Sequence, residues 1–326
     1  MTETVAILMP VHNGARFLSE QLLSITQQSF SDWALYCLDD GSTDESMEIL
    51  RKAAVGDCRI QVLPVTSGGA RGVLESVQRL LGHALVDDHS VFFLADQDDI
   101  WMSDKLEFSL SSLLALEGTR HGKPALISTD AELIDETGSL IAASYLRAMH
   151  YHRGEDALRD LLGRNYVQGC TVAFNRSLAE LAMPLPAEAV MHDWWFGLCA
   201  SAAGTYRYLP QASVKYRLHG ENFVGHSGFL SGLVRSLTHV GPRWVAGQDE
   251  LQRSITQAAA LRRRLRERSI PVEAPTEVYA DLSRKAPLAR LLPAVRGEFR
   301  ASNPILRLLF LLRLLVLPKV GVGVPK

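Results

Sequence analysis

The segment Asp96-Gln-Asp-Asp99 places three carboxylates directly after the apolar run 91–95. Carboxylates at positions i and i+2 beyond the end of a strand, such as Asp96 and Asp98, can share one divalent cation and the groups that it holds. Hard oxygen ligands suit Mg²⁺ or Mn²⁺, and such ions commonly bind substrate phosphates. The alternative is an exposed acidic turn that caps a helix starting near Ser103.

A second acidic cluster, Asp39-Asp-Gly-Ser-Thr-Asp44, follows the apolar run 33–38. It is compatible with an ordinary turn in which Ser42 or Thr43 caps the next helix. In a functional interpretation, one carboxylate accepts the N3–H of a pyrimidine base and another contacts the ribose, while His12-Asn13 closes the other side of the base. Neither GxGxxG nor GxxxxGK[ST] is present, which weighs against a dinucleotide enzyme or a P-loop NTPase.

A third candidate is His192-Asp193, which stands before Trp194 and Trp195. An Asp at a helix start is most often a cap, but a general base in a sugar pocket with aromatic walls would look similar. Each tryptophan is equally compatible with the core. His219, in the segment 216–222, is ambiguous on its own.

Alternating strands and helices must position these groups. Runs 5–9, 33–38, 59–64 and 91–95 read as strands separated by helices, which predicts a parallel sheet with right-handed crossovers. Ligands of such sheets bind beyond the carboxyl ends of the strands, where Pro10–Asn13, Asp39–Asp44 and Asp96–Asp99 lie. Further strands are expected at 126–129, 171–174 and 206–209, with a sheet-edge strand at 214–217. Helices are expected over 192–204 and 248–268, followed by a linker with Pro271 and Pro275.

The charge is divided unevenly along the 326 residues. Residues 1–225 carry a net charge of −12 and residues 226–326 carry +10, although the total is only −2. With 47% hydrophobic residues the chain is not mainly disordered. An acidic front region would repel phosphate backbones, so no nucleic-acid partner is expected. The four cysteines lack metal-site spacing and predict buried free thiols in a reducing compartment.

The Leu-rich tail over 305–320 is interrupted by Arg307, Arg313 and Lys319. Arg307 and Arg313 do not share one face of a helix. The tail is compatible with a helix buried against its own domain or a dimer partner. The preferred interpretation is shallow insertion at the cytoplasmic face of the membrane, with Arg side chains reaching anionic headgroups. No signal peptide and no full membrane span are indicated, so we expect a cytoplasmic protein, peripheral on the inner face of the plasma membrane.

Together, Pro10-Val-His-Asn13, Asp39–Asp44, Ala95–Trp101, Gly169-Cys-Thr, His192-Asp193 and Tyr216–Asn222 resemble the motifs of family 2 glycosyltransferases, over roughly residues 4–225. The strings are similar to those of bacterial rhamnosyltransferase-type members that build O-antigen and other surface glycans. The resemblance implies an inverting enzyme of the GT-A fold, an α/β class with a Rossmann-like, mostly parallel sheet flanked by helices. The expected domains are 1–225, divided into a nucleotide-sugar half (1–103) and an acceptor half (104–225), and a basic helical extension over 226–326.

The resemblance also implies a role for each matching position. Asp193 would be the catalytic base, and Asp98 would ligate a divalent Mg²⁺ or Mn²⁺ with His219 as a further contact. Trp194, Trp195, Gly169 and Cys170 would contact the acceptor. The dTDP- or UDP-sugar donor would be bound by Pro10, His12, Asn13, Asp39, Asp40, Arg71, Asp96 and Gln97.

The expected reaction is one displacement onto a lipid-linked or polysaccharide acceptor, with L-rhamnose as one candidate sugar. Two other classes fit the pattern less well. A sugar-nucleotide nucleotidyltransferase would need a Gly-rich basic loop after the first strand, which Pro10–Gly14 does not supply. A non-catalytic scaffold of a glycan-assembly complex would be favoured by a broken acidic motif or a missing base.

Overall fold

The computed structural model describes residues 4–64, 71–118, 122–151, 156–220, 240–296 and 304–318. They form two compact units. The first comprises 1–149, 167–186 and 191–217, and the second comprises 150–166, 187–190 and 218–326. The domain boundary expected at residue 225 lies outside the described residues.

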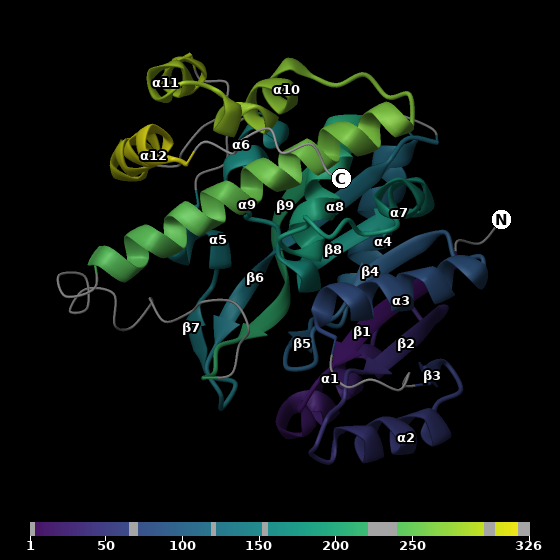
Figure 1. The fold of residues 1–326 in the computed structure, drawn as a ribbon. Coiled ribbons are helices and arrows are strands. Elements are labelled where there is room, and N and C mark those ends of the chain that lie inside the picture. Colours follow the sequence, from purple (N-terminus) through teal and green to yellow (C-terminus); the bar gives the residue numbers. More distant parts are fainter. Residues whose placement is uncertain are drawn as a thin grey trace. The chain divides into compact units, whose positions relative to one another are not determined.

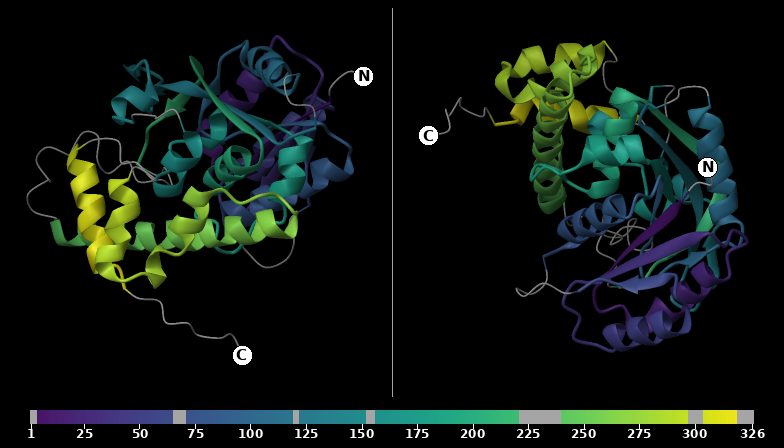
Figure 2. Two further views of the ribbon diagram at one scale, coloured as in Figure 1. Left: turned by 90° about the horizontal axis from the view of Figure 1, so that it is seen from above. Right: turned by 90° about the vertical axis from the view of Figure 1, so that its right-hand side faces the viewer.

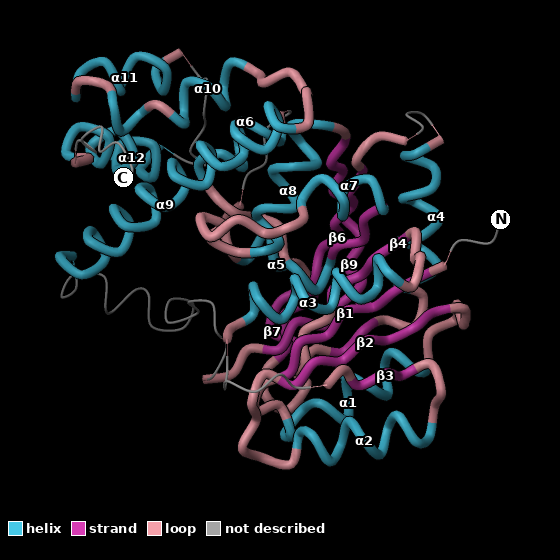
Figure 3. The backbone as a smooth tube through the Cα atoms, turned by 45° about the vertical axis from the view of Figure 1, so that its right-hand side comes forward, coloured by secondary structure: helices cyan, strands magenta, loops and turns pink. Residues whose placement is uncertain are grey.

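The first unit is built on a nine-stranded sheet with the order β3-β2-β1-β4-β8-β6-β9-β5, while β7 pairs with β6 (Figures 1 and 3). β1 to β4 are mutually parallel, and the antiparallel β8 separates β4 from β6. The strands are β1 (Val5–Val11), β2 (Trp33–Asp39), β3 (Ile60–Val62), β4 (Val91–Leu94), β5 (Ile100–Trp101), β6 (Ala125–Ile134), β7 (Leu140–Ala142), β8 (Val172–Asn175) and β9 (Thr205–Arg217).

Helices cover both faces of this sheet. α3 packs on β1 and β2 and contacts α7 and α8, whereas α4 packs on β6, β8 and β9 from the other side (Figure 2). The central strands are buried on both faces, which explains their uninterrupted apolar sequence. The helices of this unit are α1 (Ala15–Thr26), α2 (Ser46–Gly56), α3 (Val73–Val86), α4 (Lys105–Glu117), α5 (Tyr145–Ala148), α7 (Arg176–Ala182) and α8 (His192–Ala203), with a 3-10 turn at Gly169–Thr171.

The first four expected strands are confirmed, although β1 continues through Pro10 to Val11. The expectation of two strands at 206–209 and 214–217 is wrong, because β9 is one strand of 13 residues. Its pairing with β6 shifts register near Asp130, and this irregularity accommodates Pro210 within the strand. Residues 214–217 are also not at the sheet edge, since β5 pairs beyond them.

The second unit is helical. It contains α6 (Ala157–Gly163), α9 (Val240–Glu267), α10 (Ala274–Ala280), α11 (Pro287–Val295) and α12 (Pro304–Val316), with a 3-10 turn at Leu282–Arg284. The expected Arg-rich helix is confirmed as α9, which begins earlier than expected. Pro275 lies in the first turn of α10 and not in a linker, because proline is tolerated there. Within the described ranges, no helix is long and apolar enough to cross a membrane.

Candidate active site

The turn after β2 is organised around Asp39. Its Oδ2 accepts hydrogen bonds from the main-chain N–H groups of Gly41 (3.2 Å) and Ser42 (3.1 Å). Gly41 has a φ of 83°, which favours glycine at this position. Asp39 is buried, yet its Oδ1 has no hydrogen-bond partner among the described residues. One carboxylate oxygen is thus fixed by the chain while the other lacks a donor.

Asp40 is used differently. Its two oxygens accept the main-chain N–H groups of Arg71 (2.9 Å) and Gly72 (2.8 Å) at the start of α3. Arg71 is therefore brought to the β2 turn by its backbone. Asp39 and Asp40 are the two carboxylates expected to bind a pyrimidine base. Among the described residues, Asp39 Oδ1 has no hydrogen-bond donor, whereas both oxygens of Asp40 accept main-chain N–H groups.

The end of β1 is tied to the turns after β2 and β4. The His12 N–H donates to Gln97 Oε1 (2.7 Å), and Gln97 Nε2 donates back to the His12 carbonyl (2.9 Å). Asn13, with a φ of 49°, accepts the Thr43 N–H on its side-chain oxygen (2.8 Å). Pro10 lies within β1, opposite Leu38 of β2. The fold thus joins the three strand ends that the sequence pattern singled out.

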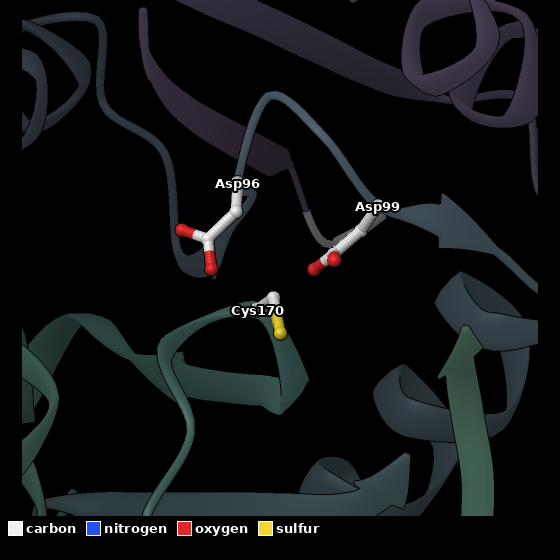
Figure 4. A group of neighbouring side chains, drawn as sticks. All are labelled: Asp96, Asp99 and Cys170. Carbon is white, nitrogen blue, oxygen red and sulfur yellow. The ribbon is translucent and has the colours of Figure 1, made fainter. Parts of the chain in front are cut away.

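A group of possible metal ligands is centred on the β4 turn. Single ligand atoms of Asp96, Asp99 and Cys170 all lie within 4.8 Å of one another. Figure 4 shows the carboxyl groups of Asp96 and Asp99 and the thiol of Cys170 close to one another. Asp99 is fully buried and its Oδ2 lacks a hydrogen-bond partner in the part of the chain that the structure describes.

The electrostatics of this group favour added positive charge. Burial, together with the charges of Asp98 and Asp193, raises the pKa of Asp96 to about 7. Burial and the charges of Asp98 and Asp96 hold the pKa of Asp99 well above its usual range. Crowded carboxylates with an unsatisfied buried oxygen fit a divalent cation, which would relieve their mutual repulsion.

Asp193, in the first turn of α8, connects to this group. The Gly169 N–H donates to its Oδ2 (3.1 Å), and the Trp194 N–H donates to its Oδ1 (2.6 Å). Gly169 directly precedes Cys170, so Asp193 is linked through one main-chain hydrogen bond to the Asp96–Asp99–Cys170 group. A Cβ at Gly169 would lie 3.0 Å from His192 Nε2, which is tighter than most Cβ contacts.

Arg217, at the end of β9, supports the β4 turn from within the protein. Its side chain is only 1% exposed and donates to the carbonyls of Asp98 (2.9 Å) and Glu136 (3.1 Å) and to the Glu20 carboxylate (2.5 Å). Its main-chain N–H donates to Asp99 Oδ1 (3.1 Å). This role of Arg217 is not evident from the sequence, although the residue stands inside the 216–222 motif.

Lys105 is a second basic residue that sequence analysis missed. It is fully buried, and its ammonium group lies 4.7 Å from the centre of the Trp101 ring. Burial lowers the pKa of Lys105 to about 8, while the charges of Cys170 and Asp99 oppose that shift. No local sequence signal marks it, because a lysine early in a helix is usually solvated.

The structure places the remaining expected site residues in different surroundings. Trp194 and Trp195 are buried, and the Trp195 indole N–H donates to the Ala182 carbonyl (3.0 Å). Their burial is compatible with the core interpretation, and an acceptor contact of either ring stays a prediction. His219 belongs to the second unit and is not part of the Asp96–Asp99–Cys170 group, nor is Asp98. Cys170, expected at the acceptor, lies among the possible metal ligands.

Comparison with known proteins identifies the class. Residues 6–114 match the model of glycosyl transferase family 2. The dTDP-rhamnosyl transferase RfbG of Shigella flexneri is 31% identical over 242 residues, which are 72% of this chain and 80% of that protein. The fold is shared with a mannosyltransferase of Pyrobaculum calidifontis, solved with GDP-Man and Mn²⁺, at a TM-score of 0.51, 16% identity and coverage of 96% and 86% of the two chains.

The fold is thus of the GT-A type, as expected. The chain belongs to glycosyl transferase family 2. Another similar protein is the UDP-Glc:alpha-D-GlcNAc-diphosphoundecaprenol beta-1,3-glucosyltransferase WfgD of Escherichia coli, 32% identical over 34% of this chain. The chain covers 41% of that relative and 42% of a Haemophilus influenzae glycosyltransferase, about two fifths of each.

Proposed function

We propose that this protein is an inverting transferase that moves a hexose from a dTDP- or UDP-sugar to a lipid-linked or polysaccharide acceptor in the synthesis of a bacterial surface glycan. L-rhamnose is the candidate sugar, since the relative matched over most of its length is named a dTDP-rhamnosyl transferase. The observation that carries the proposal is the meeting of Asp193 with the Asp96–Asp99–Cys170 group through Gly169.

In this proposal Asp193 is the general base. It removes the proton from an acceptor hydroxyl while that oxygen attacks the anomeric carbon, and the bond from that carbon to the nucleoside diphosphate breaks. A single displacement inverts the configuration. The two main-chain N–H donors hold the Asp193 carboxylate in one orientation, so it need not reorganise before reaction.

The nucleotide lies at the ends of β1 and β2. Asp39 Oδ1, which has no hydrogen-bond partner among the described residues, accepts the N3–H of a pyrimidine in this proposal, and Asp96 faces the ribose or the metal. The neighbouring loops are held by hydrogen bonds of His12, Asn13 and Gln97. Asp40 holds the main chain of Arg71 next to them.

A divalent Mg²⁺ or Mn²⁺ would be held by carboxylates of the β4 turn, with Asp98 as the ligand implied by the family resemblance. Such an ion supplies charge neutralisation and Lewis acidity toward a diphosphate. The chain's own contribution is the position of the turn, which Arg217 fixes through the Asp98 carbonyl.

A lipid-linked acceptor places the reaction at a membrane surface, and we propose that the protein works as a peripheral protein on the inner face of the plasma membrane. The relative WfgD is named for an undecaprenol-linked acceptor, which supports this location. The basic C-terminal region, with a net charge of +10 over 226–326, is the part suited to that surface.

Calorimetric titration of dTDP and UDP, each with Mn²⁺ or Mg²⁺, tests the proposal. Metal-dependent binding should occur in the wild type and be lost in Asp98→Ala. The exposed Asp32→Ala is a matched control that should bind as the wild type does. The proposal is abandoned if the wild type binds neither nucleotide with or without metal.

A further inference from the structure

One side of α12 is packed within the second unit. Leu314 and Leu317 are buried, and the fully buried guanidinium of Arg290, on α11, donates to both of their carbonyls. It also donates to the carbonyls of Lys285 (2.9 Å) and Ser283 (3.2 Å). An Arg that binds the last carbonyls of a helix caps it, so the end of α12 is held against α11.

Arg313 fastens α12 to α9. Its guanidinium carbon lies 5.7 Å from the centre of the Trp244 ring, and its carbonyl accepts a hydrogen bond from Gln248 Nε2 (3.2 Å). A Cβ at Gly247 would collide with the Arg313 guanidinium, so glycine permits this approach. Arg313 thus packs inward, contrary to the expectation that it reaches lipid headgroups. The side chain of Arg307 lies outside the described residues.

The other side of α12 is exposed and apolar. Leu308, Leu312 and Val316 repeat every four residues, which places them on one face of the helix, and are 58%, 42% and 58% exposed. On α11, Leu288 and Leu292 are also four residues apart and are 78% and 51% exposed. The two helices contact each other and lie side by side in Figure 2. Clustered exposed leucines of this kind mark an interaction surface.

The positive charge around α11 and α12 indicates which partner the exposed leucines bind. Residues 282–326 hold nine Lys and Arg and a single Glu, a net charge of +8. Neither α11 nor α12 contains an acidic residue, and the exposed Arg284 and Arg296 stand just before and just after α11. A second copy of the chain would bring the same positive charge to the interface. An anionic lipid surface offers both the opposite charge and an apolar layer.

We propose that α11 and α12 form a preformed membrane-binding surface. Its exposed apolar side chains enter one leaflet of an anionic phospholipid membrane; they are Leu288, Leu292, Leu308, Leu312 and Val316. Arg290 holds α11 and α12 together and Arg313 holds α12 on α9, so the surface needs no folding on the lipid. The inference rests on the proposed function only in placing the acceptor at a membrane, and it names the surface that binds there.

The experiment is sedimentation of the full-length protein with vesicles of phosphatidylcholine, with and without phosphatidylglycerol. The wild type should bind the anionic vesicles, and high salt should weaken that binding. Leu308→Ser/Leu312→Ser and Leu288→Ser/Leu292→Ser should each lower the apparent affinity about tenfold or more. Val55→Ser/Val86→Ser, which changes two exposed valines of the first unit, is the matched control and should bind normally.

Three outcomes would overturn the inference. These are a wild type that does not bind anionic vesicles, a Leu308→Ser/Leu312→Ser variant that binds as well as the wild type, and lipid-free dimers that this variant dissociates. Nucleotide titration of the same variants separates the two proposals. Vesicle binding without nucleotide binding would leave this surface standing and refute the proposed transfer, and the reverse result would refute this surface alone.

Discussion

Two acidic turns, which follow β2 and β4 on either side of β1, use their carboxylates in opposite ways. In the turn after β2, Asp39 and Asp40 accept four main-chain N–H groups, and Asp39 Oδ1 has no donor within the described segments. In the turn after β4, burial and neighbouring carboxylate charges raise the pKa of both Asp96 and Asp99, and a buried thiol lies beside them.

The difference shows what each turn is suited to bind. Carboxylates that accept main-chain hydrogen bonds define a rigid shape, which suits recognition of a planar base. Carboxylates that repel one another hold unfavourable electrostatic energy until a cation arrives, which suits metal and diphosphate binding. Asp-rich composition alone does not separate these two uses.

The largest effect is expected for Asp193→Asn, which alters the group facing the β4 turn. An amide cannot take up the acceptor proton, so kcat should fall by about 10²–10⁴-fold. Metal-dependent nucleotide binding should persist, because the β2 turn and the β4 carboxylates are unchanged. Steady-state kinetics and calorimetry on one preparation measure both. A fall of less than about tenfold would remove Asp193 from the role of base.

Arg217→Ala tests whether the β4 turn depends on support from within. The variant loses donors to the carbonyls of Asp98 and Glu136, so the free energy of unfolding should fall by about 3 kcal/mol. Arg16→Ala is the matched control, since Arg16 pairs with the Glu136 carboxylate at the surface (2.6 Å) and should cost under about 0.5 kcal/mol. Chemical denaturation compares them, and equal losses would contradict the supporting role.

The strands and the three strand-end clusters were predictable because each rests on local sequence. A buried parallel strand is a continuous apolar run, and Asp39 or Asp96 follows such a run directly. The expected convergence of these ends then follows from the topology of an open parallel sheet.

What the sequence could not predict depends on contacts between distant segments. Arg217 reaches Asp98 across 119 positions, and the burial of Lys105 follows from its packing beneath Trp101. The unbroken β9 required a register shift that absorbs Pro210, which appears only when β6 is alongside. The proximity of Cys170 to Asp99 is likewise not evident from the residues that flank Cys170 in the sequence.

A smaller effect distinguishes the two carboxylates of the β2 turn. Asp39→Asn removes the charged acceptor proposed for a pyrimidine N3–H, so UDP or dTDP should bind about 10–100-fold more weakly. Asp40→Asn should weaken binding less, because Asp40 acts through the main chain of Arg71 and Gly72. Calorimetry ranks the two variants. If Asp40→Asn weakened nucleotide binding more than Asp39→Asn, Asp40 would be the residue that binds the pyrimidine.

The smallest effect concerns the two hydrogen bonds between the Gln97 side chain and the main chain of His12, which join the β4 turn to the end of β1. A Cβ on Gly14 would lie 2.5 Å from Gln97 Oε1, so Gly14→Ala must displace the amide that pairs with the His12 main chain. The backbone at Gly14 has a φ of −99°, which alanine tolerates. Gly14→Ala should therefore cost about 1 kcal/mol of stability in the wild type and almost nothing in Gln97→Ala. A double-mutant cycle by chemical denaturation measures the coupling, and additive losses would show that Gln97 does not tie the end of β1 to the β4 turn.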